Sequence, residues 1–304
     1  MLRSTFLYLS GQNWLRHWME TSSLSQRLTS RFIAGRTLED GIRVSTQLSK
    51  DHIFTSLDYL GENVRSVDEA ARSRDSYLKA VGAIKLHKLP ATVSIKLTQF
   101  GLDLSEKLCR DNVTQLLEHA RSAGTEVEID MESSEYTDRT LRIVSDLHDQ
   151  FGGHVRAVIQ AYLYRSEKDV ASLSAKSIPI RLCKGAYREA SEVAYQKKAD
   201  VDRNYVKLMK YLLDHGSYPA IASHDEAIIK TCLRYVKENS ITEDRFEFQM
   251  LYGIRRDLQR ALTKSHFRLR SYVPYGDAWY PYFMRRLAER PANLLFIVRN
   301  LLRS

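Results

Sequence analysis

The chain has 304 residues, of which 43% are hydrophobic and 27% are charged. A chain of this length and composition can bury a large core, as one large domain or two smaller ones. No apolar run approaches the length that a membrane-spanning helix needs, and the first ten residues lack the apolar core and cleavage site of a signal peptide. The sequence therefore predicts a globular protein of the cytoplasm.

Cysteine usage and charge exclude further classes of protein. Cys109, Cys183 and Cys232 are far apart and form no CxxC pair, which predicts neither a disulfide framework nor a zinc site and favours a reducing compartment. The formal net charge is +9, but the basic residues are spread along the chain without a recognition motif. We therefore expect no nucleic-acid partner, although a basic surface can also attract acidic lipid headgroups.

Helical and strand-like segments alternate along most of the chain. Residues 1–50 are predicted to be helical, because their apolar residues recur at mostly helical spacings. Beyond them, short apolar runs rich in β-branched residues are predicted to be strands, at 52–56, 92–96, 126–131, 155–163, 178–183, 218–223, 246–251 and 267–273. The predicted helices are 66–86, 104–122, 134–151, 167–176, 186–215, 225–239 and 254–264, followed by a last helix with Asp277 as its N-cap.

This alternation predicts the fold class. Strands that alternate with helices form a parallel sheet with crossover helices, and eight such units are the number in a closed (βα)8 barrel. The competing architecture is a doubly wound open sheet. It normally has a glycine-rich turn after its first strand, whereas residues 55–61 contain one glycine.

Polar side chains follow the predicted strands at their carboxyl ends, where a barrel of this type has its active site. Every one of these ends has a charged or hydrogen-bonding side chain within or just after an apolar run. The residues are Glu62, Lys96, Asp130, Gln160, Tyr162, Arg181, Lys184, Ser223, His224, Gln249, Tyr252, Tyr272 and Tyr275. We interpret this set as a candidate site.

Single residues of this set each allow two interpretations. Lys96 is either a lysine at a sheet edge or barrel mouth that extends to water, or an anion ligand in a barrel mouth. Asp130 is either a helix N-cap or a residue that positions a cationic or hydroxyl neighbour. Arg181 and Lys184, at a turn with a glycine, offer cations and backbone N–H groups to a phosphate or an electron-rich ring. His224 either caps a helix or binds a cofactor phosphate or ribose, and no metal is expected because no second histidine lies at ligand spacing.

The last predicted helix contains a pair of arginines. Steps of three and four residues place Tyr282, Arg285, Arg286 and Glu289 on one helix face. Two adjacent arginines suit a small ligand with a carboxylate, because a guanidinium fork binds both of its oxygens. The alternative is a solvated charged face with an ordinary Arg–Glu pair.

Several of these segments together resemble a known family. They are residues 181–189 (RLCKGAYRE), 223–228 (SHDEAI), 246–253 (FEFQMLYG) and 272–293 (YVPYGDAWYPYFMRRLAERPAN), with 56–64 and 94–105. They resemble the FAD-dependent proline dehydrogenases, in particular the short bacterial monofunctional type. The resemblance implies a distorted (βα)8 TIM-like barrel in residues 51–304, with an N-terminal helical extension in residues 1–50 and the C-terminal helix over the barrel mouth. One departure is Arg188, where many members of the family have an aromatic residue.

The resemblance also implies roles for individual residues. In the substrate pocket, Arg285, Arg286 and Lys96 would bind the carboxylate of L-proline, and its ring would be enclosed by Tyr187, Leu251, Tyr272 and Tyr282. Asp130 would support the cations, Glu289 the arginines, and Glu62 would be a gate carboxylate that meets Arg285. The implied contacts of FAD are Val158, Gln160, Arg181, Lys184, Gly185, Ala186, Tyr187, Ser223, His224 and Gln249.

The implied reaction is oxidation of L-proline to Δ1-pyrroline-5-carboxylate by hydride transfer to N5 of FAD, the first step of proline catabolism to glutamate. Its implied partners are a quinone electron acceptor, a separate pyrroline-5-carboxylate dehydrogenase and the inner face of the membrane. Two rival functions stay open. One is a flavin barrel that acts on another cyclic amine such as hydroxyproline. The other is a basic nucleic-acid-binding or scaffold protein with a degenerate barrel, which predicts no bound flavin.

Overall fold

The computed structural model describes residues 29–61 and 64–289, the last five of them by their backbone alone. The helices predicted within residues 1–28, the gate residue Glu62 and the end of the chain after residue 289 lie outside the described residues. Within the described part, no helix is both long and apolar enough to cross a membrane.

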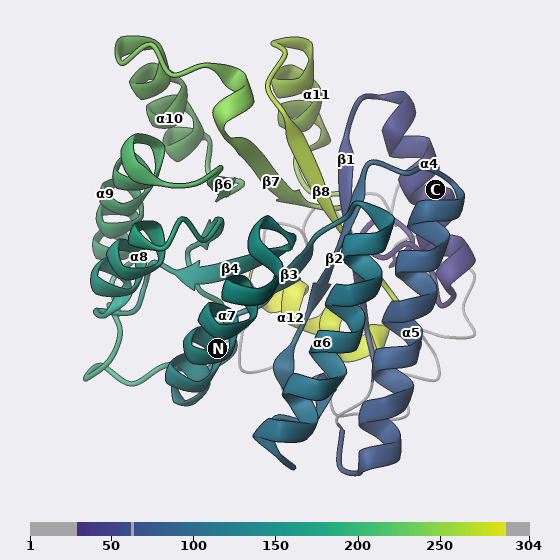
Figure 1. Ribbon diagram of the computed structural model, residues 1–304. Coiled ribbons are helices and arrows are strands. Elements are labelled where there is room, and N and C mark those ends of the chain that lie inside the picture. Colours follow the sequence, from purple (N-terminus) through teal and green to yellow (C-terminus); the bar gives the residue numbers. More distant parts are fainter. Residues whose placement is uncertain (1–28, 62–63, 290–304) are drawn as a thin grey trace.

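Parallel strands form a closed barrel in the order β1 to β8, and β8 pairs with β1 to complete it (Figure 1). The strands are β1 (Phe54–Tyr59), β2 (Ala91–Ile95), β3 (Val127–Ile129), β4 (Val155–Gln160), β5 (Ile180–Cys183), β6 (Ala220–Ala222), β7 (Glu247–Leu251) and β8 (Leu269–Tyr275). The predicted (βα)8 barrel is therefore confirmed, and the doubly wound open sheet is wrong.

Helices follow the strands and surround the barrel (Figure 1). They are α5 (Val67–Leu86), α6 (Glu106–Ala123), α7 (Thr137–Phe151), α8 (Ser166–Ala175), α9 (Lys198–His215), α10 (Glu226–Glu238), α11 (Arg256–Lys264) and α12 (Trp279–Glu289). Several start where a side chain satisfies a free backbone N–H group: Ser66 accepts from Glu69, and Ser105 accepts from Leu108.

The helix α4 (Leu38–Lys50) precedes the barrel and packs against β1 and β8. Thr37 and Asp40 form a capping box at its start. The helix approaches closely at Gly41, where a Cβ atom would lie 3.3 Å from side-chain atoms of Leu57 and of Tyr275. This position makes α4 the outer cover of the two strands at which the barrel closes, and it confirms helix in the last part of residues 1–50.

The last described helix, α12, lies at the carboxyl ends of the strands. Its Trp279, Tyr282 and Phe283 form one buried cluster with Leu60, which follows β1, and Ile254, which follows β7. Figure 1 draws this helix in yellow. The predicted C-terminal helix over the barrel mouth is confirmed.

Many predicted boundaries differ from the structure by one to three residues, and three differences have a physical cause in the contacts described here. The first strand was expected at 52–56 but runs from Phe54 to Tyr59, because the barrel interior accepts the charged side chain of Asp58 within a strand. The predicted cap Asp277 does not begin α12, which starts at Trp279. Its Oδ1 instead accepts a hydrogen bond from Nε of Arg36 (2.7 Å).

The helix predicted at 186–215 begins only at Lys198. The preceding backbone bonds to the end of the β4 unit instead: the N–H of Tyr195 donates to the carbonyl of Tyr162 (2.8 Å), and Leu163 forms an antiparallel bridge with Ala194. Gly185 has φ +116°, and a Cβ atom there would lie 2.3 Å from the ring of Tyr162. Only glycine suits this turn, and it directs the chain away from a helix.

Candidate active site

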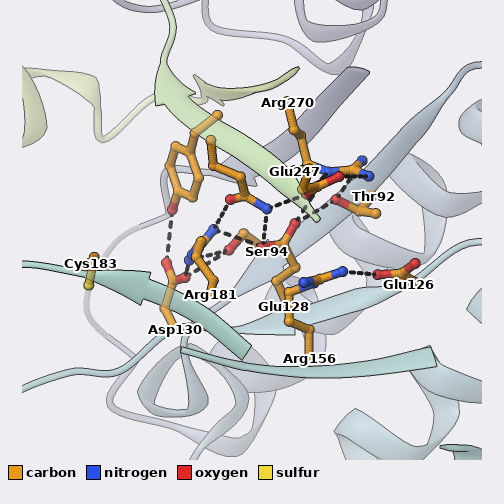
Figure 2. Close-up of polar contacts among 12 residues, drawn as sticks. Thr92, Ser94, Glu126, Glu128, Asp130, Arg156, Arg181, Cys183, Glu247 and Arg270 are labelled. Atoms are coloured by element: carbon orange, nitrogen blue, oxygen red, sulfur yellow. Dashed lines mark hydrogen bonds and ion pairs between the residues drawn. The ribbon is translucent and has the colours of Figure 1, made fainter. Parts of the chain in front are cut away.

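The interior of the barrel is polar. Successive residues of a strand point to opposite sides, so every second residue faces the interior. The side chain of Gln249 on β7 reaches Glu128 on β3, and that of Arg181 on β5 reaches Ser94 on β2. These strands are not neighbours in the sheet, so the contacts cross the interior of the barrel. Figure 2 shows the resulting chain of charged and polar groups.

Lys96 follows β2 at the mouth of the barrel and lies between two carboxylates. Its Nζ is 3.2 Å from Oδ1 of Asp58 and 3.5 Å from Oδ2 of Asp130. Burial alone would lower the pKa of Lys96, but the two carboxylates raise it above its ordinary value. A lysine at a sheet edge is the wrong interpretation, because the closed barrel has no edge. Lys96 lies at the mouth, where its ammonium group contacts two carboxylates, and its role as an anion ligand stays a prediction.

Asp130 follows β3 and connects four side chains. Its Oδ1 accepts from Oγ of Ser94 (2.8 Å), its Oδ2 accepts from the hydroxyl of Tyr272 (2.9 Å), and it pairs with both Arg181 and Lys96. Burial would raise the pKa of this carboxyl group, but the two cations and the two hydroxyl donors together hold it below its ordinary value. Asp130 therefore positions cationic and hydroxyl neighbours.

The alternative role of Asp130 as a helix N-cap is wrong. The next helical segment is the short 3₁₀ helix η2 (Ser134–Tyr136), and its N-cap is Ser133.

Arg181 on β5 is buried and held by two acidic residues. Its Nη1 is 3.0 Å from Oε2 of Glu128, and its Nη2 contacts Oδ1 of Asp130. The guanidinium also lies over the ring of Tyr272, 5.2 Å from its centroid. Burial would lower the pKa of Arg181, but the neighbouring carboxylates raise it. An arginine predicted in the flavin site thus contacts two residues predicted in the substrate site.

The four predicted ring-binding residues lie in three places, and Tyr272 is the one beside Asp130. Tyr282 is buried in the cluster of α12, and Leu251 at the end of β7 packs against that cluster. Tyr187 lies on the connection between β5 and α9, where its side chain is 40% exposed. The side chains of Arg285, Arg286 and Glu289 lie outside the described residues, so their roles stay predictions.

The other predicted cofactor ligands line the ends of β4 to β7. Gln160 donates through Nε2 to the carbonyl of Glu132 (2.7 Å) and accepts from the N–H of Ala186 (3.3 Å). Nε2 of His224 accepts from the N–H of Leu251 (2.8 Å), so this nitrogen carries no proton. Val158, Ser223 and Gln249 are buried.

Lys184 follows β5 and lies between two carboxylates. Its Nζ is 2.5 Å from Oδ1 of Asp202 and 2.8 Å from Oδ2 of Asp225. Burial would raise the pKa of Asp225, but Lys184 and Lys198 lower it to about 2.

The donor chemistry of this region fits a flavin nucleotide. Arg181 and Lys184 come from β5 and His224 from the end of β6, which pairs with β5. Together with the turn at Gly185, where the absence of a Cβ atom leaves the backbone uncovered by a side chain of its own, they provide cations, ring nitrogens and backbone N–H groups. Such groups suit an anionic pyrophosphate joined to a polar ring.

Our sequence analysis missed the buried residues below the mouth, although a signal for them exists. Ser94 precedes Lys96 by two residues, Glu128 precedes Asp130, Glu247 precedes Gln249, and Arg270 precedes Tyr272. Residues two apart on a strand share a face, so polar alternation predicts each of these positions. Asp58 was missed as well, because the first strand was predicted to end at residue 56, which puts Asp58 in the turn that follows.

Comparison with known proteins identifies relatives along the whole chain. The family model described as proline dehydrogenase matches residues 42–299. Proline dehydrogenase 1 of Bacillus subtilis (strain 168) is 40% identical to this chain over 100% of both. Proline dehydrogenase of Deinococcus radiodurans is 42% identical over 91% of both.

A solved structure has the same fold. Proline utilization A (PutA) of Bdellovibrio bacteriovorus, inactivated by N-propargylglycine, superimposes with a TM-score of 0.81 at 28% identity. The match covers 86% of this chain and 32% of the PutA chain, so this chain spans about a third of the length of that protein.

Proposed function

The chain belongs to the proline dehydrogenase family, of the short monofunctional type, and from this premise we propose that it oxidises L-proline to Δ1-pyrroline-5-carboxylate with FAD as its cofactor. The observation that carries the proposal is the group of Lys96, Asp130, Arg181 and Tyr272 in mutual contact at the barrel mouth. Arg181, Lys184 and His224 would hold FAD, which would supply hydride-accepting chemistry at N5, with a quinone as the final electron acceptor.

The charged groups suit the substrate. An ammonium group has three N–H donors, and Lys96 uses two of them for Asp58 and Asp130, which leaves one for the carboxylate of proline. We propose that Arg285 and Arg286 bind the same carboxylate, which would place the C5 carbon of the ring for reaction. Asp58 and Asp130 then act as positioning residues, because they hold the lysine in place.

The pocket also favours the reactive form of the amine. Hydride leaves the carbon next to nitrogen only when the nitrogen has lost its extra proton and has a free electron pair. Lys96 and Arg181 are offset by their carboxylate partners, so the proposed Arg285 and Arg286 would supply the additional positive charge that disfavours the protonated amine. Tyr272, half-buried beside Asp130, would cover the ring and exclude water.

We further propose the context of the reaction. Residues 51–304 would be the catalytic domain and residues 1–50 a helical extension. The electron acceptor would be a quinone, reached by contact with the inner face of the membrane, and a separate pyrroline-5-carboxylate dehydrogenase would take the product. Full-length similarity to the short Bacillus enzymes supports this assignment.

The absorption spectrum of the purified protein tests the proposal. The protein should be yellow, and its flavin absorption should bleach when L-proline is added without oxygen. A colourless protein that binds no added FAD would contradict the proposed function. Bleaching that is faster with hydroxyproline than with proline would favour the rival cyclic-amine substrate.

Two arginine variants extend the same test to the substrate site. Arg285→Met should raise KM for proline by at least about thirtyfold, because loss of a buried charge contact costs about 2–5 kcal/mol. Arg203→Met is the matched control, since Arg203 lies on the surface and pairs with Asp200. Unchanged proline kinetics in flavin-loaded Arg285→Met would remove Arg285 from the site.

A further inference from the structure

The carboxylate of Glu128 lies below the active site and has no part in the proposed reaction. Glu128 is the middle residue of β3, and its side chain is completely buried inside the barrel. Its Oε2 accepts from Nη1 of Arg181 (3.0 Å) and from Nε2 of Gln249 (3.1 Å), and its Oε1 accepts from the hydroxyl of Thr92 (2.9 Å). A buried carboxylate with this many donors has a fixed position.

The position of Glu128 is itself supported from the opposite wall of the barrel. Nε2 of Gln249 also donates to Oε1 of Glu247 (2.8 Å), and Glu247 pairs with Arg270 through both carboxylate oxygens at 2.8 and 3.0 Å. Nε of Arg270 is 4.0 Å from Oε1 of Glu128. Figure 2 shows Glu128 between Arg181 and Arg270. Side chains from β2, β5, β7 and β8 therefore hold one carboxylate on β3.

The guanidinium of Arg181 is held from two directions. Asp130 contacts Nη2 at the mouth of the barrel, and Glu128 contacts Nη1 from the interior. A planar guanidinium with both terminal nitrogens bound has one orientation, whereas one bound at a single nitrogen can rotate about that contact. Glu128 therefore completes the placement of Arg181, and its negative charge offsets part of the positive charge that Arg181 presents at the mouth.

We propose that Glu128 is a positioning residue that sets the reduction potential of the cofactor through Arg181. The proposal rests on the proposed function in one respect, namely that Arg181 lies beside the flavin ring. Two-electron reduction adds negative charge to that ring. A cation beside it stabilises the reduced form, and a carboxylate behind the cation weakens this stabilisation. Removal of the charge at residue 128 should therefore shift the potential to a more positive value.

The test compares Glu128 on β3 with Glu126, which lies just before that strand. Glu128→Gln removes the charge behind Arg181. Glu126→Gln removes a charge two residues earlier, where the carboxylate pairs with Arg156 (3.2 Å) instead of Arg181. The measurement is the two-electron potential of the FAD-loaded protein, by equilibration with redox dyes. We expect a positive shift in Glu128→Gln that clearly exceeds the shift in Glu126→Gln.

A third variant separates position from charge. Glu128→Asp keeps the charge but withdraws it from Arg181 by one methylene, so the potential should lie between those of the unmodified protein and Glu128→Gln. If Glu128→Gln does not fold, the reduction potential of Glu128→Asp alone tests whether Glu128 acts on the cofactor.

Equal shifts of the reduction potential in Glu128→Gln and Glu126→Gln would overturn the inference. A reduction potential of flavin-loaded Glu128→Asp equal to that of the protein without substitution would also overturn it. Failure of the proposed function looks different, because the unmodified protein would then bind no flavin and have no such potential to measure.

Discussion

The two sides of the barrel wall differ in chemistry although they belong to the same strands. On β2, Val93 and Ile95 are completely buried among apolar residues of the outer shell, the layer between strands and helices. Their neighbours Thr92 and Ser94 face the interior and bond to Glu128 and Asp130. Alternate residues thus have different roles. Those in the shell stabilise the fold by burying apolar surface, and those in the interior fix the orientation of the polar side chains of the candidate site.

The two regions should also respond differently to substitution. Apolar packing is non-directional, so the shell tolerates hydrophobic exchanges of similar volume at modest cost. Ion pairs in the interior are directional, and each buried charge depends on its partner. Loss of one partner leaves an uncompensated charge, whereas loss of both does not. This difference can be tested in three ways.

The largest effect is expected where one partner of an interior ion pair is removed. Glu247→Ala removes the carboxylate that accepts two hydrogen bonds from Arg270, and it should lower the free energy of unfolding by about 3–5 kcal/mol. Urea denaturation measures this loss.

The matched control removes both charges. Glu247→Leu combined with Arg270→Met should recover most of the stability, because apolar groups of similar size often replace a buried pair without cost. A double variant as unstable as Glu247→Ala would contradict this explanation, because the loss of stability would then not come from an uncompensated charge.

Acid should weaken the interior more than the shell. Burial would raise the pKa of Glu247, but Arg270 and Arg156 lower it from 4.5 to about 2. A carboxyl group with a lowered pKa in the folded state stabilises the protein above its unfolded pKa, and this contribution is lost as the pH falls toward the folded value. The loss should amount to roughly 3 kcal/mol between pH 5 and pH 2.

The Glu247→Leu/Arg270→Met variant provides the comparison for this acid effect. Its free energy of unfolding should fall less steeply over the same pH range, as measured by denaturation at a series of pH values. Parallel profiles for the two proteins would show that Glu247 is not a source of the acid sensitivity.

The smallest effects compare adjacent residues of β2. Ile95→Val deletes one methyl group from the shell and should cost about 0.5–1.5 kcal/mol of stability, with proline kinetics unchanged. Ser94→Ala removes a hydroxyl that donates to Asp130 and accepts from Arg181 at 3.2 Å, so it should alter kcat for proline oxidation. Thermal unfolding and steady-state kinetics on both variants are the measurements. A kinetic defect in Ile95→Val equal to that in Ser94→Ala would contradict the proposed difference between the shell and the interior.

The fold was largely predictable from the sequence. The apolar runs were recognisable because parallel strands are buried on both faces, and eight repeats of strand and helix leave few architectures. The predicted ends of helices and strands were wrong where tertiary contacts outweighed the local sequence pattern. Asp58 lies in a strand because Lys96 pairs with it, and residues 186–197 are not helical because their backbone bonds to the segment after β4.

The candidate site was only partly predictable. Lys96, Asp130, Arg181 and Tyr272 follow or end apolar runs, and this position indicated a shared site before any contact was known. Asp58 and Glu128, which pair with Lys96 and Arg181, lie within strands, and so does Arg270, which pairs with Glu247. A charged residue within a strand interrupts the apolar pattern by which the strand is recognised. Pairing of Arg181 with Glu128 spans 53 positions of sequence, and pairing of Gln249 with Glu128 spans 121.

The sequence by itself determined the kinds of element, their order and the polar residues at the strand ends, because periodicity and turn chemistry are local properties of the chain. Only the tertiary structure decided which alternate residues face inward and which charges meet there. Closure of the barrel brings β3 opposite β7 and β8, and no residue spacing along the chain indicates that side chains on these strands meet. The same closure removes water from the interior, which is why the charges within it must pair with one another.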